Sequence, residues 1–374
     1  MGSFKINKNQ IFRTIELYAE SFESVLYETD SKFLEGMENR NLAGDDINRY
    51  KFWEWTQGVG LFGFWKLYCY TNKEKYLNIL LKYYDRQISI GLPARNVNTT
   101  TPLLAMSYVA ENQNREDYMK ICREWADWMM QSFPRTRGGG FQHMTSDTVN
   151  DQELWDDTLF MAVLFLANMG RILKRQEYIE EAKYQFLIHI KYLADNKTGL
   201  WFHGWTFHGN HNFAKGLWGR GNCWVTAAIP EFLDMIECED GLRRYLIETL
   251  ACQAEALKKY QTANGMWHTL VDDPKSYVEA SATCGFAYGI LKGVHMGILD
   301  PSDKVCAINA VKPILDLTDE QGILHQVSYG TPMGRTDKEF YKNIELKSMP
   351  YGQALAILFM LEVLKEEDTD VKPL

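Results

Sequence analysis

The sequence is short of basic side chains: its 374 residues contain 40 Lys and Arg against 49 Asp and Glu, a formal net charge of −9. Nucleic-acid binding favours a basic face, so this balance argues against such a partner. The chain also lacks any apolar run that approaches the roughly 18 uncharged residues of a transmembrane helix. Its N-terminus, MGSFKINKNQ, has neither the apolar core nor the small-residue cleavage site of a secretory signal. We therefore expect no nucleic-acid partner, no secretory signal and no membrane association.

Cysteines with the spacing of a metal or redox site are also lacking. The seven cysteines are odd in number, no two have C-x-x-C spacing, and most lie in apolar segments. This pattern is typical of buried free thiols in a cytoplasmic protein. The sequence has no H-x-x-E-H pattern, and His208 with His211 alone are too few ligands for zinc. We expect a cytoplasmic protein without a metal site.

Aromatic residues, in contrast, are abundant: 11 Trp, 20 Tyr and 19 Phe make up 13% of the chain. Several Trp residues stand in polar, Gly-rich stretches, where a hydrophobic core has no obvious use for them. Flat aromatic faces beside charged and amide groups are how a pocket binds a sugar ring. The composition is otherwise that of a globular protein, with 46% hydrophobic and 24% charged residues.

Apolar residues recur at three- and four-residue steps along most of the chain, as at Ile11, Ile15 and Tyr18. This spacing is typical of amphipathic helices. Sustained β alternation is rare, and residues 200–203 and 266–270 are expected to form small hairpin arms. We expect about twelve helices, near residues 8–27, 52–70, 76–90, 101–111, 117–132, 156–173, 178–194, 222–238, 242–260, 279–293, 303–315 and 350–365.

Four loops share a glycine that is followed by apolar or aromatic residues and a histidine, at residues 140–143, 199–203, 265–268 and 322–325. Their glycines recur at intervals of 59, 66 and 57 residues, the length of one helix pair with two connectors. Six such pairs fit the chain, and closing them into a ring leaves no exposed ends to cap. We therefore predict an all-α fold, an (α/α)6 barrel, as a single domain over residues 1–374. The alternative is that Gly-x-aromatic turns are common and that the period arises by chance.

Four carboxylates lie within residues 151–157, directly before an apolar helical segment. Capping and the helix macrodipole explain one or two of these acids, but not Trp155 beside Asp156 and Asp157. Neighbouring residues on a helix point about 100° apart, so we expect one carboxyl to face a pocket and the other to support it. Aromatic walls and a like-charged neighbour raise the pKa of a carboxyl, which suits a general acid near neutral pH.

Residues 216–225 place Arg220 among three glycines and between Trp218 and Trp224. Glycine lets the backbone approach a ligand, the planar guanidinium matches a carboxylate or phosphate, and the two Trp side chains offer stacking faces. A dinucleotide site is disfavoured because the third glycine and the preceding strand are missing. A purely structural turn would explain the glycines, but not an Arg between two Trp.

Three further stretches supply candidate ligands. Trp53 and Trp55 face different ways on a helix, so one is expected in the core, and Trp55 is assigned to the binding site. Asn98 lies in a polar run that opens a helix, where Thr capping is the alternative explanation. His143 and His203 occupy matching repeat loops, although a lone His in a loop is more often a surface or turn residue.

Together these motifs resemble the unsaturated uronyl hydrolases of glycoside hydrolase family 105 and the related family 88. The resemblance runs through most of the chain, from about Trp53 to about Ala282, and it is strongest toward the unsaturated rhamnogalacturonyl hydrolases. It implies an (α/α)6 barrel that acts, without a metal or organic cofactor, on unsaturated oligosaccharides left by polysaccharide lyases. The stretches that carry it are residues 155–161, 201–205, 218–224, 265–268 and 277–282.

By position in these motifs, the resemblance implies that Asp157 is the catalytic acid. The expected substrate-binding residues, from the motifs and from the stretches above, are Trp55, Asn98, His143, Trp155, His203, Trp218, Arg220 and Trp224. Two features depart from the family. Many members carry a second active-site acid in the region of residues 96–100, which has none here. Cys223 stands where Gly is usual, and its side chain is expected to narrow the pocket or to shift Trp224.

The mechanism that the resemblance implies is hydration of a 4,5-unsaturated uronate. Asp157 would protonate C4, water would add at C5, the hemiketal would open and the aglycone would leave. One carboxyl can serve as acid and then as base, so the pair of carboxylates that flanks an ordinary glycosidic bond is not required.

Three alternatives stay open. An inverting glycosidase on the same barrel would need a second carboxylate about 6.5–9.5 Å away, such as Glu279 or Asp151. A sugar epimerase would need two bases, such as His203 with another His. A non-catalytic oligosaccharide-binding protein would use the same Trp residues and would have no use for an Asp with a raised pKa. The sequence leaves open the sugar next to the uronate, galacturonate versus glucuronate, and whether the protein is a monomer or a homo-oligomer.

Overall fold

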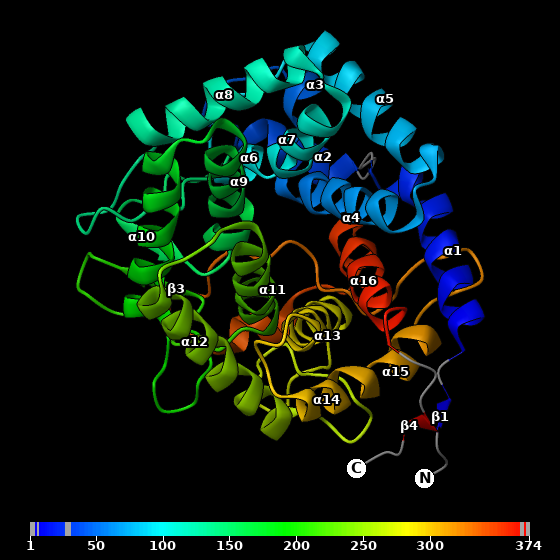
Figure 1. The fold of residues 1–374 in the computed structure, drawn as a ribbon. Helices are drawn as coiled ribbons and strands as arrows, with labels where there is room; N and C mark the ends of the chain where they lie inside the picture. Colours follow the sequence, from blue (N-terminus) through cyan, green and yellow to red (C-terminus); the bar gives the residue numbers. More distant parts are fainter. Residues whose placement is uncertain (1–3, 6, 27–30, 367–369, 372–374) are drawn as a thin grey trace. The chain divides into compact units, whose positions relative to one another are not determined.

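The computed structural model describes residues 4–5, 7–26, 31–366 and 370–371, and most of these are helical (Figure 1). The chain divides into two compact units. The N-terminal unit comprises Glu23–Tyr192 and Trp205–His211. The C-terminal unit comprises Met1–Phe22, Leu193–Gly204 and Asn212–Leu374. That residues 1–374 form a single domain stays a prediction.

The core of the N-terminal unit consists of the buried helices α4, α7 and α9, which contact one another in that order. Helices α5 and α8 pack against α4 and α7, and Gly170 of α9 lies against Ile179 of α10. The helices of this unit are α2 (Ser31–Asn39), α3 (Ile47–Tyr50), α4 (Trp55–Thr71), α5 (Glu74–Ile90), α6 (Val97–Thr100), α7 (Pro102–Gln113), α8 (Glu116–Gln131), the π-helical turn η1 (Leu159–Val163), α9 (Leu164–Leu173) and α10 (Gln176–Leu193).

The sequence explains why α4 lies inside and α5 outside. Helix α4 is apolar on nearly every side and buries most of its residues, as is typical of a helix surrounded by others. Helix α5 buries one face, which carries Tyr76, Leu80 and Tyr84 at the expected spacing, and its opposite face is polar. Helix α4 ends at Asn72, which adopts the left-handed conformation that stops a helix.

The core of the C-terminal unit consists of α11, α13 and α16 (Figure 1). Helices α11 and α13 approach closely because Gly285 has no Cβ, which would collide with the Sγ of Cys223. Cys223 is therefore buried against α13, and the expectation that it narrows a pocket or shifts Trp224 stays a prediction. The elements of this unit are β1 (Phe4–Lys5), α1 (Lys8–Leu26), α11 (Gly219–Met235), α12 (Asp240–Tyr260), α13 (Ala280–His295), η2 (Pro301–Asp303), α14 (Lys304–Asn309), α15 (Val311–Asp316), η3 (Lys338–Asn343), α16 (Pro350–Val363) and β4 (Asp370–Val371).

Three of the four repeated Gly loops share one conformation. Gly199, Gly265 and Gly322 have φ of +78°, +89° and +74°, and each lies so close to a backbone carbonyl of another helix that a Cβ would collide with it. The first loop differs, because its positive φ falls on Gly139, which has no such carbonyl contact. The conformation that the three loops share supports a repeat of helix pairs rather than a chance pattern.

All twelve expected helical segments are present, with residues 303–315 divided between α14 and α15. The short helices α2, α3 and α6 were not predicted. The expected hairpin arms form only isolated bridges, such as Ala194 with Trp201 and Trp218 with Leu270. The strands lie instead at β2 (Glu153–Trp155) and β3 (Gly204–Thr206), which pair with each other, and at β1 and β4.

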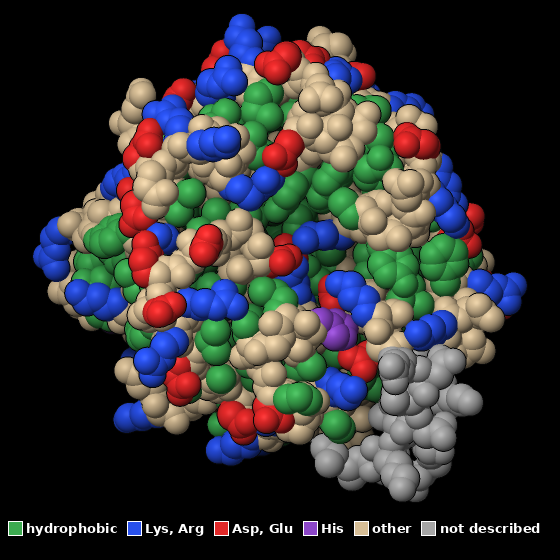
Figure 2. Space-filling view, viewed as in Figure 1, with side chains coloured by type: hydrophobic (Ala, Val, Ile, Leu, Met, Phe, Trp, Pro, Cys, Tyr) green, Lys and Arg blue, Asp and Glu red, His purple; other side chains and the backbone are tan. Residues whose placement is uncertain are grey.

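Side chains of both charges are interspersed over the visible face (Figure 2). Among the described helices, none combines the length and the apolar character that crossing a membrane requires. The seven cysteines are free thiols, and five of them are buried as expected, but Cys69 and Cys252 are exposed.

Candidate active site

The predicted site residues lie in two sets, one in each unit. Trp55, Asn98, His143, Trp155 and Asp157 belong to the N-terminal unit. The C-terminal unit holds the remaining predicted residues, which are His203, Trp218, Arg220 and Trp224.

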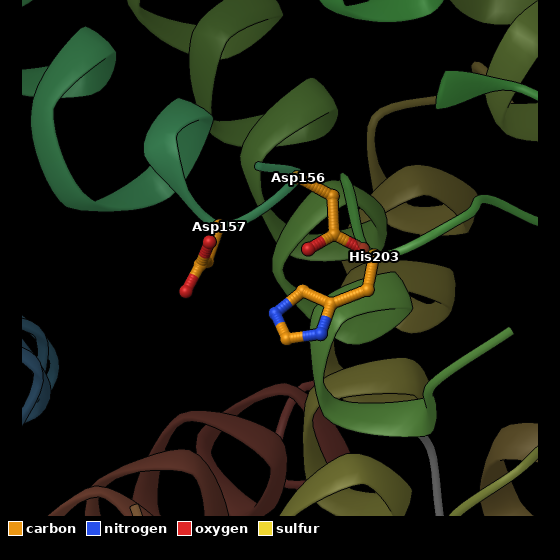
Figure 3. Close-up of side chains that lie close together, drawn as sticks. All are labelled: Asp156, Asp157 and His203. Atoms are coloured by element: carbon orange, nitrogen blue, oxygen red, sulfur yellow. The ribbon is translucent and has the colours of Figure 1, made fainter. Parts of the chain in front are cut away.

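Asp157 stands where strand β2 turns into η1. Its carbonyl oxygen accepts hydrogen bonds from the N–H groups of Phe160 and Met161, at 3.1 and 2.9 Å, and so begins the helix. Its side chain is 16% exposed, and Oδ1 lies 3.7 Å from Nδ1 of His143. Figure 3 shows the carboxyl groups of Asp156 and Asp157 leaving the backbone in different directions. Asp157 is therefore a carboxyl that a small molecule could reach.

Asp156 has the opposite environment. Its side chain is fully buried, and neither carboxyl oxygen accepts a hydrogen bond of ordinary geometry from the residues that the structure describes. Burial, and secondly the charge of Asp157, raise the pKa of Asp156 well above its usual range. The raised pKa expected of this pair is thus found on Asp156, where burial favours the protonated form.

His143 is neutral rather than cationic. Burial, and secondly the nearby His189, lower its pKa to about 3. Its Nδ1 lies 2.7 Å from Oγ1 of Thr158, and its ring stacks on Trp155 with centroids 4.3 Å apart. The contact of His143 with Asp157 is therefore polar and is not an ion pair.

Trp155 is held by a hydrogen bond from its Nε1 to Oε2 of Glu153, at 2.9 Å. It is 5% exposed, so it forms a wall behind His143. Its predicted contact with substrate stays a prediction.

Trp53 and Trp55 divide as the helical spacing predicted. Trp53 is in the core and donates from Nε1 to the carbonyl oxygen of Thr99, at 2.8 Å. Trp55 is partly exposed at the first position of α4, and Asn98 is partly exposed on α6. Between the two Trp residues lies Glu54, which bonds with Asn98 and was not predicted as a functional residue. The only sequence signal for it is an acid flanked by two Trp.

In the C-terminal unit, His203 and Trp218 form an aromatic cluster with Tyr341. Nδ1 of His203 lies 2.7 Å from the Tyr341 hydroxyl, and the His203 ring lies 4.3 Å from that of Trp218. Tyr341 was not predicted, because it follows His203 by 138 residues and no motif connects them.

Arg220 is buried and bonds with the loop at residues 328–331. Nη1 donates to the carbonyl and hydroxyl oxygens of Ser328, and Nη2 donates to the Tyr329 carbonyl and to Oγ1 of Thr331, at 3.0 and 2.8 Å. The guanidinium lies between the rings of Trp218 and Tyr351. In this structure the planar guanidinium of Arg220 holds a loop, and its contact with a uronate stays a prediction. Trp224 is 1% exposed inside α11, and its contact with the substrate also stays a prediction.

The two acids considered for an inverting glycosidase have other roles. Glu279 is buried and accepts hydrogen bonds from Ser281, Ala282 and Ser328, as the N-cap of α13. Asp151 is 62% exposed and pairs with His208. Neither environment favours a catalytic base for a water molecule.

The chain matches Glycosyl Hydrolase Family 88 over residues 32–367. It is 31% identical over 316 residues to the unsaturated rhamnogalacturonyl hydrolase YesR of Bacillus subtilis, a match that covers 84% of this chain and 90% of that protein. The crystal structure of a possible family 105 member from Klebsiella pneumoniae is 41% identical, with a TM-score of 0.89 and coverage of 96% and 94% of the two chains.

More distant structures show the fold alone. The unsaturated glucuronyl hydrolase of Bacillus sp. GL1 is 17% identical, with a TM-score of 0.69 over 98% of both chains. These enzymes have the (α/α)6-barrel fold, and the all-α prediction is confirmed. The motifs at Trp155, Trp201 and Trp218, the fold and these similarities agree: the chain belongs to Glycosyl Hydrolase Family 88 and is a glycoside hydrolase with an (α/α)6 barrel.

Proposed function

We propose that this enzyme removes a terminal 4,5-unsaturated uronyl residue from oligosaccharides that a polysaccharide lyase has produced, with unsaturated rhamnogalacturonyl oligosaccharides as the substrate class. The similarity to the Bacillus subtilis rhamnogalacturonyl hydrolase supports the substrate class. The observation that supports the chemistry is the difference in exposure between two neighbouring carboxyls. The side chain of Asp157 is 16% exposed, whereas that of Asp156 is fully buried.

In this proposal Asp157 donates a proton to C4 of the uronate. The C4=C5 double bond and the ring oxygen form a vinyl ether, so positive charge develops at C5 and on that oxygen. Water adds at C5 and returns a proton to the carboxylate of Asp157. The resulting hemiketal opens, and the aglycone leaves as an alcohol. Asp157 therefore donates one proton and is reprotonated by the attacking water. Water is the only reactant that is consumed besides the oligosaccharide.

The neighbours of Asp157 fit these roles. Because His143 is neutral, it does not hold the Asp157 carboxylate in a permanent ion pair. The raised pKa of Asp156 favours its neutral form, which adds no second negative charge beside Asp157 to repel a uronate. The predicted substrate-binding residues and the cytoplasmic location both stay predictions.

The test is to incubate the enzyme with lyase digests of several polysaccharides. Turnover is followed by the loss of the ultraviolet absorbance of the conjugated uronate and by mass spectrometry of the released sugar. We expect loss of absorbance together with release of the aglycone from a rhamnogalacturonan digest. Release of sugar with the absorbance retained would instead indicate an ordinary glycosidase.

A further inference from the structure

Glu54 is a buried carboxyl for which the proposed chemistry has no role. It lies just before α4 and is 5% exposed. Its backbone N–H donates to Oε1 of Gln57, at 3.2 Å. Helix capping alone does not require an acid here, because Ser, Thr and Asn serve as well and carry no charge to bury.

The side chain of Glu54 connects three segments of the N-terminal unit. The Ser146 hydroxyl donates to Oε1 of Glu54, and Nδ2 of Asn96 donates to that hydroxyl at 3.0 Å. The Asn98 amide also donates to the Glu54 carboxyl. The carboxyl thereby links the start of α4, helix α6 and the loop that begins at His143.

This network lies next to the candidate catalytic acid. Helix α6 packs against η1, the helical turn that follows Asp157. The N–H of Val97 donates to the carbonyl of Met144, at 3.0 Å, so α6 is bound to the residue after His143. Asn98 on α6 is partly exposed, whereas Glu54 behind it is not.

We propose that Glu54 is a positioning residue of the active site, which sets through its hydrogen bond the direction in which the Asn98 amide faces the substrate. This inference rests on the proposed function. An ionised Glu54 accepts from Nδ2 of Asn98 and leaves Oδ1 directed away from it. A protonated Glu54 can donate to Oδ1, so that the amide turns and Nδ2 is directed away.

The electrostatic surroundings make both states of Glu54 available. Burial, and to a smaller extent the charge of Asp147 on the same loop, raise its pKa to about 7 against the opposing effect of the hydrogen bonds from Ser146 and Asn98. An oxygen of Asp147 itself lies 3.4 Å from Nη1 of Arg40. Tyr50 of α3 faces Glu54 as a neutral phenol, because burial and then the Glu54 charge raise the pKa of Tyr50.

No residue of α6 is charged, since this helix reads Val-Asn-Thr-Thr after Asn96. Among these groups, Glu54 is therefore the one that changes charge near neutral pH. The amide of Asn98 would offer the substrate a hydrogen-bond acceptor above this pH and a donor below it.

The experiment compares pH profiles of kcat/KM for the wild type, Glu54→Gln and Ser146→Ala on an unsaturated rhamnogalacturonyl disaccharide. We expect an inflection near pH 7 in the wild type that is absent in Glu54→Gln, whose kcat/KM falls about tenfold, the scale of one hydrogen bond. Ser146→Ala removes a donor to the carboxylate, so its inflection should move to higher pH. This variant keeps Glu54 and gives an answer even where Glu54→Gln does not fold.

Glu231→Gln is the matched control, because Glu231 is a buried carboxyl bonded to Tyr288 and Lys292, and Lys292 also pairs with Asp234. Its profile should equal that of the wild type. In a protein that already carries Asn98→Ala, adding Glu54→Gln should not change the pH profile of kcat/KM any further. An inflection that persists in Glu54→Gln, or one that does not move in Ser146→Ala, would overturn the role of Glu54. A wild type that leaves the disaccharide intact would instead refute the proposed function, and this inference with it.

Discussion

The two sets of predicted site residues differ in what their polar groups do. In the N-terminal unit, burial raises the pKa of Asp156, lowers that of His143 to about 3 and raises that of Glu54 to about 7. In the C-terminal unit, Arg220 donates four hydrogen bonds to one loop, and Glu279 accepts bonds from three residues. Perturbed pKa values are typical of groups that transfer protons, and a buried guanidinium that bonds with one loop holds the conformation of that loop. We infer that the N-terminal set carries the proton chemistry and that the hydrogen bonds of the C-terminal set maintain the conformation of its own loops.

Asp157→Asn is expected to have the largest effect on activity, and it tests whether the N-terminal set carries the chemistry. The amide has nearly the same size but cannot donate the proton, so turnover should fall about 10²–10⁴-fold or more, while the melting temperature stays close to that of the wild type. The measurement is kcat by the absorbance assay, with circular dichroism as the check on folding. Rates near those of the wild type would remove Asp157 from the mechanism.

The second prediction concerns stability and pH at Glu54. Because its pKa is raised from 4.5 to about 7, the buried carboxyl stabilises the fold fully below pH 4.5 and loses that contribution as pH rises through 7. The loss is about 3 kcal/mol. Glu54→Gln does not titrate, so its free energy of unfolding relative to the wild type should increase from pH 5 to pH 8. Urea denaturation at the two pH values measures this difference, and a constant difference would contradict the raised pKa.

Arg220→Lys tests the C-terminal set. Lysine keeps the charge but cannot reach Ser328, Tyr329 and Thr331 with a planar fork. We expect a loss of about 2 kcal/mol of unfolding free energy, together with a raised KM, and a smaller change in kcat than in Asp157→Asn. Thermal unfolding and steady-state kinetics separate these effects. Unchanged KM and stability would show that the fork is not needed.

Asp156→Asn is the matched partner of Asp157→Asn and should have the smallest effect on rate. Because burial favours the neutral form of Asp156, an amide of similar size should cost less than about tenfold in kcat. Because the folded-state pKa of Asp156 is raised, the wild type loses stability as pH rises above the ordinary Asp pKa, and the amide variant does not. If Asp156→Asn were inactive and Asp157→Asn active, the two roles would be exchanged.

The sequence was sufficient for the helices because their apolar residues repeat with a regular period. Helix α5 presents Tyr76, Leu80 and Tyr84 on one face, and the structure buries them. Helices α3 and α6 have only four residues each, too few for a period to be recognised. They form because capping residues such as Asp46 and Asn96 bind their first N–H groups.

Within the site, prediction succeeded where the residues lie close together in the chain. The sequence placed Asp156 and Asp157 together and predicted that one would face a pocket and the other would support it. It could not show that Tyr341 contacts His203 or that Ser328 holds Arg220. These two contacts join residues more than a hundred positions apart, and local spacing carries no information about them. The sequence also could not show which of the two Asp side chains is buried. Glu54 was overlooked because its raised pKa depends on burial rather than on any motif.

The measurement that tests the account most directly is the position of solvent hydrogen in the product. Reaction in heavy water should place one deuterium at C4 of the released uronate product, because Asp157 exchanges its proton with solvent before it protonates the double bond. Mass spectrometry and NMR of the product read this out. Aglycone release with no deuterium at C4 would contradict protonation of the double bond, because a direct glycosidase delivers water to the anomeric carbon and leaves C4 untouched.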